Sequence, residues 1–333
     1  MKSLLQRSLL AGFATLVLSG FVTPSATSAA PFPFLQPGFT QSLWGVYPNF
    51  LGGVAFASDG DAWVDFCAFS GSPLLRFDRQ TTVLVNGTLI HPLVGGVPFA
   101  SNAGCGLTTH PNGSLYSNTS SGVVQLDGNT AAQTGGPFGP AGNALGIAVN
   151  PNAPYDMVYV GSDGTLYKVN AALSSFIVFS LAVQGSFVDG ISWDPTGAYL
   201  FLANRSPNFR LTILRADGTL VQHVPMTSEP DGISFNSSQN FVVTNNTDGT
   251  MTRFDFAGNN FSLVPVVSLF ASGGFRGDLS QVGTEGCIYL TQDGARYDDG
   301  TVTTENSVVR ICGDFTPVDA RPTTWGKLKA SYR

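Results

Sequence analysis

Short runs of alternating apolar and polar residues, separated by turns rich in Gly, Asn and Asp, fill most of the chain. The segments TLYKV at 165–169 and MTRFDF at 251–256 alternate apolar and polar residues, which is typical of half-buried β-strands. Turns such as Asn112-Gly113 and Asp163-Gly164 supply the positive φ that tight hairpins need. The pattern predicts an all-β protein built from short antiparallel strands.

One unit of this pattern recurs six times. A small or acidic residue, a glycine and an aliphatic residue open a strand, and a turn and a second apolar strand follow. The copies start 53, 40, 44, 42 and 46 residues apart, at Gly52, Cys105, Leu145, Asp189, Asp231 and, in degenerate form, Gly277. A period of about 40–50 residues with several strands per unit is typical of a β-propeller. We therefore predict one six-bladed β-propeller with four-stranded antiparallel blades over residues 31–318. A two-sheet sandwich, the main alternative, does not account for the period.

Each unit continues into a third strand and often into a fourth. The expected third strands are residues 74–78, 122–127, 164–170, 211–218, 249–256 and 307–312. The last unit lacks an obvious fourth strand, and we expect residues 39–47 to supply it. This pairing would close the ring and remove exposed sheet edges.

Composition agrees with this fold and excludes several classes of function. Charged residues make up 11% of the 333 residues, and the chain contains 39 glycines and 25 phenylalanines. These values argue against a coiled coil and against a disordered chain. The formal net charge is −6 and no basic run stands out, so a nucleic-acid partner is not expected. We expect a monomer that binds a small molecule or an extracellular ligand.

Both ends of the chain differ from the repeats. Lys2 and Arg7 precede an apolar stretch and then small residues up to Ala30, which is typical of a signal peptide over residues 1–30. An uncleaved anchor is the alternative, and no later stretch is long and apolar enough to span a bilayer. Residues 319–333 form a basic tail that we interpret as a docking or sorting tag or as a frayed terminus. The sequence thus predicts a secreted or periplasmic protein.

Four cysteines in an exported chain favour two disulfides over a metal site. If residues 287–292 and 307–312 form an antiparallel hairpin, Cys287 faces Cys312 across it. Cys67 would then pair with Cys105, and the repeat supports this pairing. Cys67 ends a second strand beside the start of the next unit, where Cys105 lies.

The repeat also predicts where a site lies, because the first strand of each blade lines the central channel. Alignment on the aliphatic residue gives a ring of Gly52, Cys105, Leu145, Asp189, Asp231 and Gly277, with Asp278 one step on. A second ring comes from the ends of the second strands and includes Asn204 and Asn245. Oxygen ligands of this kind suit Ca²⁺ or Mg²⁺, and a cation would relieve the repulsion between the acids.

We therefore interpret Asp189, Asp231, Asp278, Asn204 and Asn245 as candidate cation ligands. Turn capping and satisfaction of loop backbone are the alternative explanation for the same residues. Arg205, Glu229 and Arg276 flank the ring and are candidate contacts for an anionic or polar ligand, although ordinary surface ion pairing is the favoured explanation for them.

Common catalytic motifs are absent from the sequence. It contains no G-x-S-x-G elbow, no H-E-x-x-H, no P-loop and no dinucleotide fingerprint. The three histidines, His91, His110 and His223, are scattered, which argues against a zinc site and a catalytic triad.

The segments DGISWDPTGAYLFLAN from Asp189 and EPDGISF from Glu229 resemble the SMP-30/gluconolactonase/LRE-like six-bladed propellers. NHL-type propellers share much of this sequence pattern. The likeness is clearest from about residue 185 to 256. It implies a divalent cation, commonly Ca²⁺, held by a Glu, two Asn and an Asp, that assists hydrolysis of lactones or related esters. Asp231 matches the Asp that also acts as acid and base, and Asp189 stands where one Asn is expected. The chain departs from that pattern at Gly52, where the Glu is expected, and at Cys105, near the other Asn.

Two functions follow from these observations. The favoured one is an exported binding or scaffold propeller with an acidic ligand or Ca²⁺ site at the channel mouth. The alternative is a divalent-metal-dependent hydrolase of a lactone or ester, in which Asp231 moves the proton. The fold alone does not distinguish them.

Overall fold

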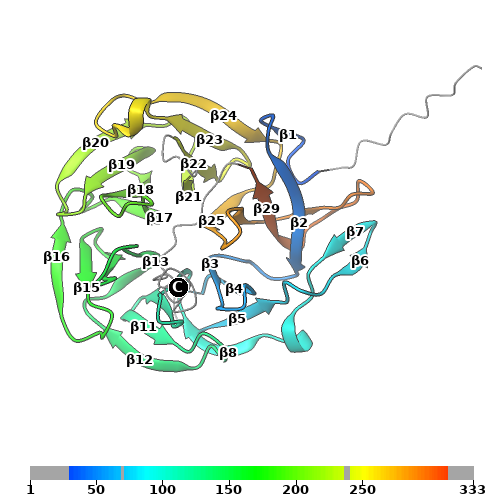
Figure 1. Ribbon diagram of the computed structural model, residues 1–333, viewed down its shortest axis with the longest axis horizontal. Coiled ribbons are helices and arrows are strands. Elements are labelled where there is room, and N and C mark those ends of the chain that lie inside the picture. Colours follow the sequence, from blue (N-terminus) through cyan, green and yellow to red (C-terminus); the bar gives the residue numbers. More distant parts are fainter. Residues whose placement is uncertain (1–29, 69–70, 236–240, 314–333) are drawn as a thin grey trace, which may run out of the picture.

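The computed structural model describes residues 30–68, 71–235 and 241–313, and within them six antiparallel sheets surround a central axis (Figure 1). The predicted six-bladed β-propeller is confirmed. The expected basic tail, and the expected signal peptide apart from Ala30, lie outside the described residues. In the described part of the chain, no helix is long and apolar enough to cross a membrane.

Each blade runs outward from an innermost strand. Blade one contains β3 (Val54–Phe56), β4 (Ala62–Asp65), β5 (Ser72–Phe77) and β8 (Phe99–Ala103). Blade two contains β9 (Gly106–Thr109), β10 (Leu115–Thr119), β11 (Gly122–Leu126) and β12 (Gln133–Phe138). Blade three contains β13 (Gly142–Val149), β14 (Met157–Gly161), β15 (Leu166–Val169) and β16 (Phe176–Ser180).

Blade four contains β17 (Phe187–Trp193), β18 (Tyr199–Ser206), β19 (Arg210–Arg215) and β20 (Leu220–Pro225). Blade five contains β21 (Pro230–Phe235), β22 (Phe241–Asn246), β23 (Met251–Asp255) and β24 (Val266–Ser272), with the short β1 (Phe34–Leu35) added at its edge. Blade six contains β25 (Gly277–Val282), β26 (Ile288–Gln292), β29 (Asn306–Cys312) and β2 (Thr40–Tyr47).

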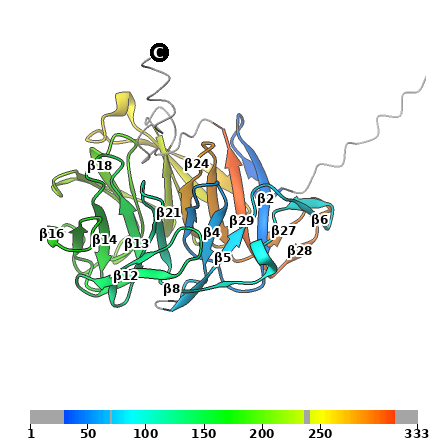
Figure 2. The same ribbon diagram turned by 60° about the horizontal axis from the view of Figure 1, so that its bottom comes forward.

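Two small hairpins extend from the same side of the disc, as Figures 1 and 2 show: β6 (Val83–Val85) with β7 (Thr88–Ile90), and β27 (Ala295–Arg296) with β28 (Val302–Thr303). They contact each other, since the backbone N–H of Asp298 donates to Thr88 Oγ1 at 2.6 Å. Short 3₁₀ turns occur at Val94–Gly96 and Ala257–Asn259.

Strand β2, near the N-terminal end of the described chain, closes the ring, as expected. β2 pairs with β29 from Thr40↔Cys312 to Tyr47↔Asn306, so blade six combines the two ends of the described chain. The expected hairpin register is also present, with Ile288 opposite Ile311. Both predicted disulfides form, Cys67–Cys105 and Cys287–Cys312. Two disulfides indicate an oxidising, extracellular compartment.

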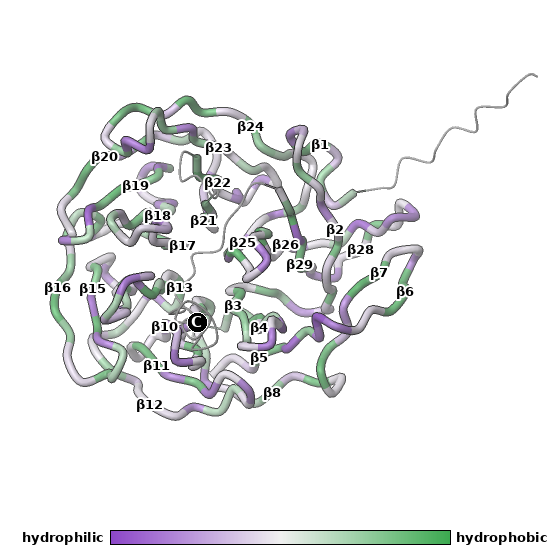
Figure 3. The backbone as a smooth tube through the Cα atoms, viewed as in Figure 1, coloured by the Kyte–Doolittle hydropathy of each residue, from purple (hydrophilic) through white to green (hydrophobic). Residues whose placement is uncertain are grey.

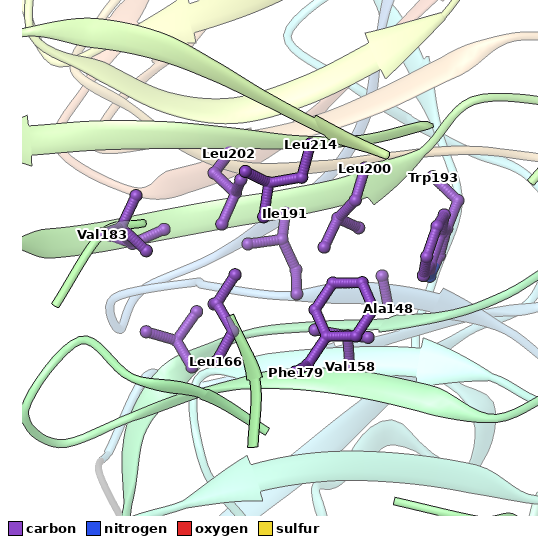
Figure 4. Packing of buried hydrophobic residues seen from close by; sticks show 12 residues of the cluster. Ala148, Val158, Leu166, Phe179, Val183, Ile191, Trp193, Leu200, Leu202 and Leu214 are labelled. Atoms are coloured by element: carbon purple, nitrogen blue, oxygen red, sulfur yellow. The ribbon is translucent and has the colours of Figure 1, made fainter. Parts of the chain in front are cut away.

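The hydrophobic core lies between neighbouring blades. Figure 4 shows the packing between blades three and four, where Val158 and Leu166 face Ile191, Leu200 and Leu214. Hydrophobic residues also extend onto the outermost strands, as Figure 3 shows for β16 and β24. There Ile177 and Val266 are 55% and 70% exposed, so the apolar pattern of the outer strands does not come from burial alone.

Neighbouring blades come so close at the axis that the repeated motif requires glycine. A Cβ on Gly106 would lie 1.4 Å from the carbonyl oxygen of Leu145 in the next blade. A Cβ on Gly190 would lie 2.4 Å from the carbonyl oxygen of Asp231. Neither position has room for a side chain, which explains the glycine that follows the acid in the repeat.

Candidate functional site

Three aspartates occupy equivalent positions because the innermost strands of blades four, five and six contain the same β-bulge. In blade four, Val188 pairs with Asn204, and the next regular pair is Ile191 with Leu202. Two residues of β17 therefore oppose one residue of β18, and β21 and β25 show the same shift. A bulge of this kind redirects a side chain at the rim of a sheet. The first bulge residues are Asp189, Asp231 and Asp278.

The register changes the expected alignment of blade six by one residue. Gly277 still belongs to the regular ladder, where it pairs with Gln292, and Asp278 is the ring residue. Leu279 then stands where the other blades have glycine. Its side chain packs in one buried cluster with Cys105 and Leu145. The ring is thus acidic over blades four to six and apolar elsewhere, with a hydrophobic base.

The channel below the ring is nearly filled. A cavity of about 20 Å³ remains, lined mainly by glycines and aliphatic side chains of the innermost strands. This volume admits about one water molecule. This cavity has no room for a larger molecule.

The three ring carboxyl groups are buried and repel one another. Asp231 is 1% exposed, and neither carboxylate oxygen has a hydrogen-bond partner among the described residues. Burial, followed by the charges of Asp189 and Asp278, raises the pKa of Asp231 well above its ordinary value. Burial, followed by the charge of Asp189, raises the pKa of Asp278 to about 8. Asp278 Oδ1 accepts a hydrogen bond from the backbone N–H of Leu279 at 2.9 Å.

Asp189 differs from the other two because it has a cationic partner. Arg205 Nη1 donates to Asp189 Oδ2 at 2.8 Å, and Arg205 Nε donates to Glu229. Burial raises the pKa of Asp189 to about 6, and the charge of Arg205 opposes this rise. Asp189 therefore ionises more readily than Asp278.

The residues that flank the ring form ion pairs beside it, Arg205 with Glu229 and Arg276 with Asp293. Arg276 Nη1 pairs with Asp293 Oδ2 at 3.0 Å, and its charge opposes the rise in the pKa of Asp278. The guanidinium groups of Arg205 and Arg276 each lie 5.4 Å from an aromatic ring centre, that of Phe187 and that of Phe50 respectively. The structure thus brings Arg205, Glu229 and Arg276 to the rim, and their contact with a ligand stays a prediction.

Sequence reasoning missed Phe50, Phe187 and Asp293. Phe187, Glu229 and Arg276 each lie two residues before a ring aspartate, so the repeat carried a signal for Phe187. Phe50 and Asp293 lie outside the innermost strands and had no such signal.

Asn204 and Asn245, the two candidate ligands of the second ring, form hydrogen bonds with other residues of the protein. Asn245 Nδ2 donates to the carbonyl of Asp278 in the next blade. Asn204 Oδ1 accepts from Thr212 Oγ1 at 2.5 Å. In each of these two residues one buried atom has no partner among the described residues: Asn245 Oδ1, an acceptor, and Asn204 Nδ2, a donor. Asn245 is therefore better suited to a cation than Asn204.

A tighter group of potential metal ligands lies on the apolar side of the ring. Within the described chain, the one set of three with ligand atoms within 4.8 Å of each other is Asp65, Cys67 and Cys105. Both sulfurs are joined in a disulfide, and Asp65 accepts backbone N–H groups of Gly53 and Cys67 at 3.0 and 2.7 Å. These hydrogen bonds and the disulfide connect the segment after β4, which contains Cys67, to the ring positions at Gly53 and Cys105. The ring aspartates are spaced more widely, so an ion there would need further ligands from water or a bound molecule.

Comparison with known proteins supports the fold. No family model and no curated protein matches the chain in sequence. An oxidoreductase of the glucose dehydrogenase type from Thermus thermophilus superimposes with a TM-score of 0.58 at 17% identity, covering 83% of this chain and 100% of that one. A gluconolactonase from Xanthomonas campestris gives 0.58 at 11%, covering 87% and 98%. The calcium structure of an AA12-family carbohydrate-active enzyme from Trichoderma reesei gives 0.60 at 9%, covering 85% and 98%. The chain thus has the fold of gluconolactonase-like six-bladed propellers.

Proposed function

We propose that the channel mouth is the active site of a hydrolase that cleaves a lactone or ester of a small molecule with the help of a divalent cation, Ca²⁺ in the first instance. The observation that carries this proposal is the Asp231 carboxyl group, which is buried without a hydrogen-bond partner among the described residues. An unpaired buried carboxylate is costly, and groups of this kind concentrate at functional sites.

The donor set and the charge suit a cation. Asp189, Asp231, Asp278, Glu229 and Asp293 provide five carboxyl groups around two guanidinium groups, those of Arg205 and Arg276. Full ionisation would leave an excess of three negative charges. Asp231 and Asn245 Oδ1 would hold the ion, since both offer acceptor atoms that no described residue uses. A bound Ca²⁺ supplies polarisation of the substrate carbonyl.

The chain's own residues would handle the proton. Ionised Asp231 accepts a proton from a water molecule as the water oxygen forms its bond to the carbonyl carbon. The bond from that carbon to the leaving oxygen then breaks, and Asp231 returns the proton to the departing alkoxide. The products are a carboxylic acid and an alcohol, which remain one molecule if the substrate is a lactone. Burial raises the pKa of Asp231, which makes its ionised carboxylate a stronger base than an exposed aspartate.

A binding propeller with a structural cation is the second candidate. It is favoured by Gly52, which provides no side chain where the resemblance expects a Glu, and by Arg205, which occupies an oxygen of Asp189. In that case the same mouth would hold a small or extracellular ligand without turning it over.

Calorimetric titration of Ca²⁺ into the wild type and D231N tests both candidates. D217N is the matched control, because Asp217 lies in an exposed turn remote from the mouth. We expect Ca²⁺ binding in the wild type and D217N, its loss in D231N, and Ca²⁺-dependent turnover of lactones or aryl esters. Binding without turnover would leave the binding propeller, and undiminished Ca²⁺ binding in D231N would refute the ligand assignment.

A further inference from the structure

A second pocket opens on blade four, away from the ring. Its cavity volume is about 540 Å³, and Arg210 and His223 line it together with Phe209 and Met226. This volume lies within the usual range for small-molecule pockets. None of its lining residues is acidic, although the whole chain carries a formal net charge of −6.

Arg210 differs from most arginines of the described chain. Arg76, Arg205, Arg253, Arg276 and Arg310 all form ion pairs with carboxylates. Arg210 forms none with a described residue, and its one side-chain hydrogen bond is from Nη2 to Ser186 Oγ at 3.3 Å. Its Nε is buried and has no described partner. The guanidinium therefore retains donors for a carboxylate or phosphate group.

A hydrogen-bond chain fixes the orientation of His223. Thr212 donates its hydroxyl proton to Asn204 Oδ1, so His223 Nδ1, which lies 2.9 Å from Thr212 Oγ1, must be the donor in that contact. The other ring nitrogen, Nε2, is then free, and it becomes a donor when the imidazole is protonated. Burial and the nearby charge of Arg210 lower the pKa of His223. The negative charge of a bound anion would offset the charge of Arg210 and raise the pKa of His223 again.

We propose that this pocket binds an organic oxyanion, a phosphate or carboxylate group, through the guanidinium of Arg210 and the imidazole of His223. The walls formed by Phe209 and Met226 would contact the apolar part of the same molecule. The proposal does not depend on the function assigned to the channel mouth.

The test is calorimetric titration at constant ionic strength with inorganic phosphate, phenyl phosphate, acetate and benzoate. The wild type is compared with R210Q, R210K and R215Q. Arg215 is the matched control because it is exposed at the other end of the same strand, β19, and its replacement removes the same charge. The phosphate and carboxylate arms distinguish the two kinds of anion, and the aromatic members test the apolar walls.

We expect millimolar or tighter binding of at least one anion to the wild type and about a tenfold or larger loss in R210Q. R215Q should bind as the wild type does, and R210K should weaken binding because it lacks the planar fork. In an NMR titration of the three histidines, the bound anion should raise the pKa of His223 alone. Absence of binding to the wild type, or equal losses in R210Q and R215Q, would overturn the proposal. If R210Q fails to fold, R210K and the histidine titration of the wild type decide the question.

Discussion

Asp278 holds in blade six the bulge position that Asp231 holds in blade five, and the charge of Asp278 raises the pKa of Asp231. Together with Asp189 they form a buried group whose members are hard to ionise at the same time. This group should dominate the response of the protein to pH and to cations.

Stability without metal should fall as the pH rises from about 4 to about 8. Burial raises the pKa of Asp189 to about 6 and that of Asp278 to about 8, above the value of 3.8 expected in the unfolded chain. Below about pH 4 their contribution is fully present, because both states bind the proton. At higher pH the unfolded chain releases the proton first, and the contribution is lost as the pH passes the folded-state pKa values. Thermal unfolding in chelator-treated buffer measures this decline, which should be shallower in D278N. If the Tm of the wild type rises across this range, and the Tm of D278N rises with the same slope, the prediction is contradicted.

Added Ca²⁺ should raise the Tm more at pH 8 than at pH 5. The cation competes with protons for the ring carboxylates, and most of these are protonated at the lower pH. Differential scanning fluorimetry with and without a chelator checks this. D231N should lose the shift and D217N should keep it. An equal shift at both pH values would point to a site elsewhere.

Replacement of Arg205 by glutamine should raise the pKa of Asp189 above about 6, since the ion pair that favours its charged form is removed. NMR titration of the Asp189 side-chain carboxyl carbon measures the change directly. The control variant R215Q removes the exposed guanidinium of Arg215 and should leave the pKa of Asp189 unchanged. An unchanged midpoint in R205Q would show that the ion pair with Arg205 does not contribute to this pKa.

Ring closure should depend on the buried face of β2. Leu43 is 1% exposed and packs against Ile90, Ala295 and Tyr297, so Leu43→Ala should lower the free energy of unfolding by about 2–5 kcal/mol. Thr40→Ala, at an exposed position of the same strand, should change it by less than about 0.5 kcal/mol. Urea denaturation compares the two. Equal, small losses would mean that β2 adds little to the stability of the propeller.

Features that repeat along the chain were predictable from the sequence, because each copy supports the others. The spacing of the copies predicted six blades. Antiparallel pairing of residues 287–292 with residues 307–312 placed Cys287 opposite Cys312 and so predicted that disulfide. The position of Asp278 was one residue off, since a bulge adds a residue without changing the apolar pattern. The pocket of Arg210 and His223 escaped prediction because its residues come from a turn and two outer strands, and the repeat predicts such strands without fixing which side chains meet there.

Blade six also bears on how the protein is made. Apart from the short edge strand β1, its strand β2 is the first to be synthesised, whereas its partner β29 is synthesised last among the described strands. The circle therefore stays incomplete until the last of the described strands has been synthesised. A circular permutant that begins at β3 and carries β2 after β29 would bring this blade together in consecutive sequence, and it should assemble with less delay.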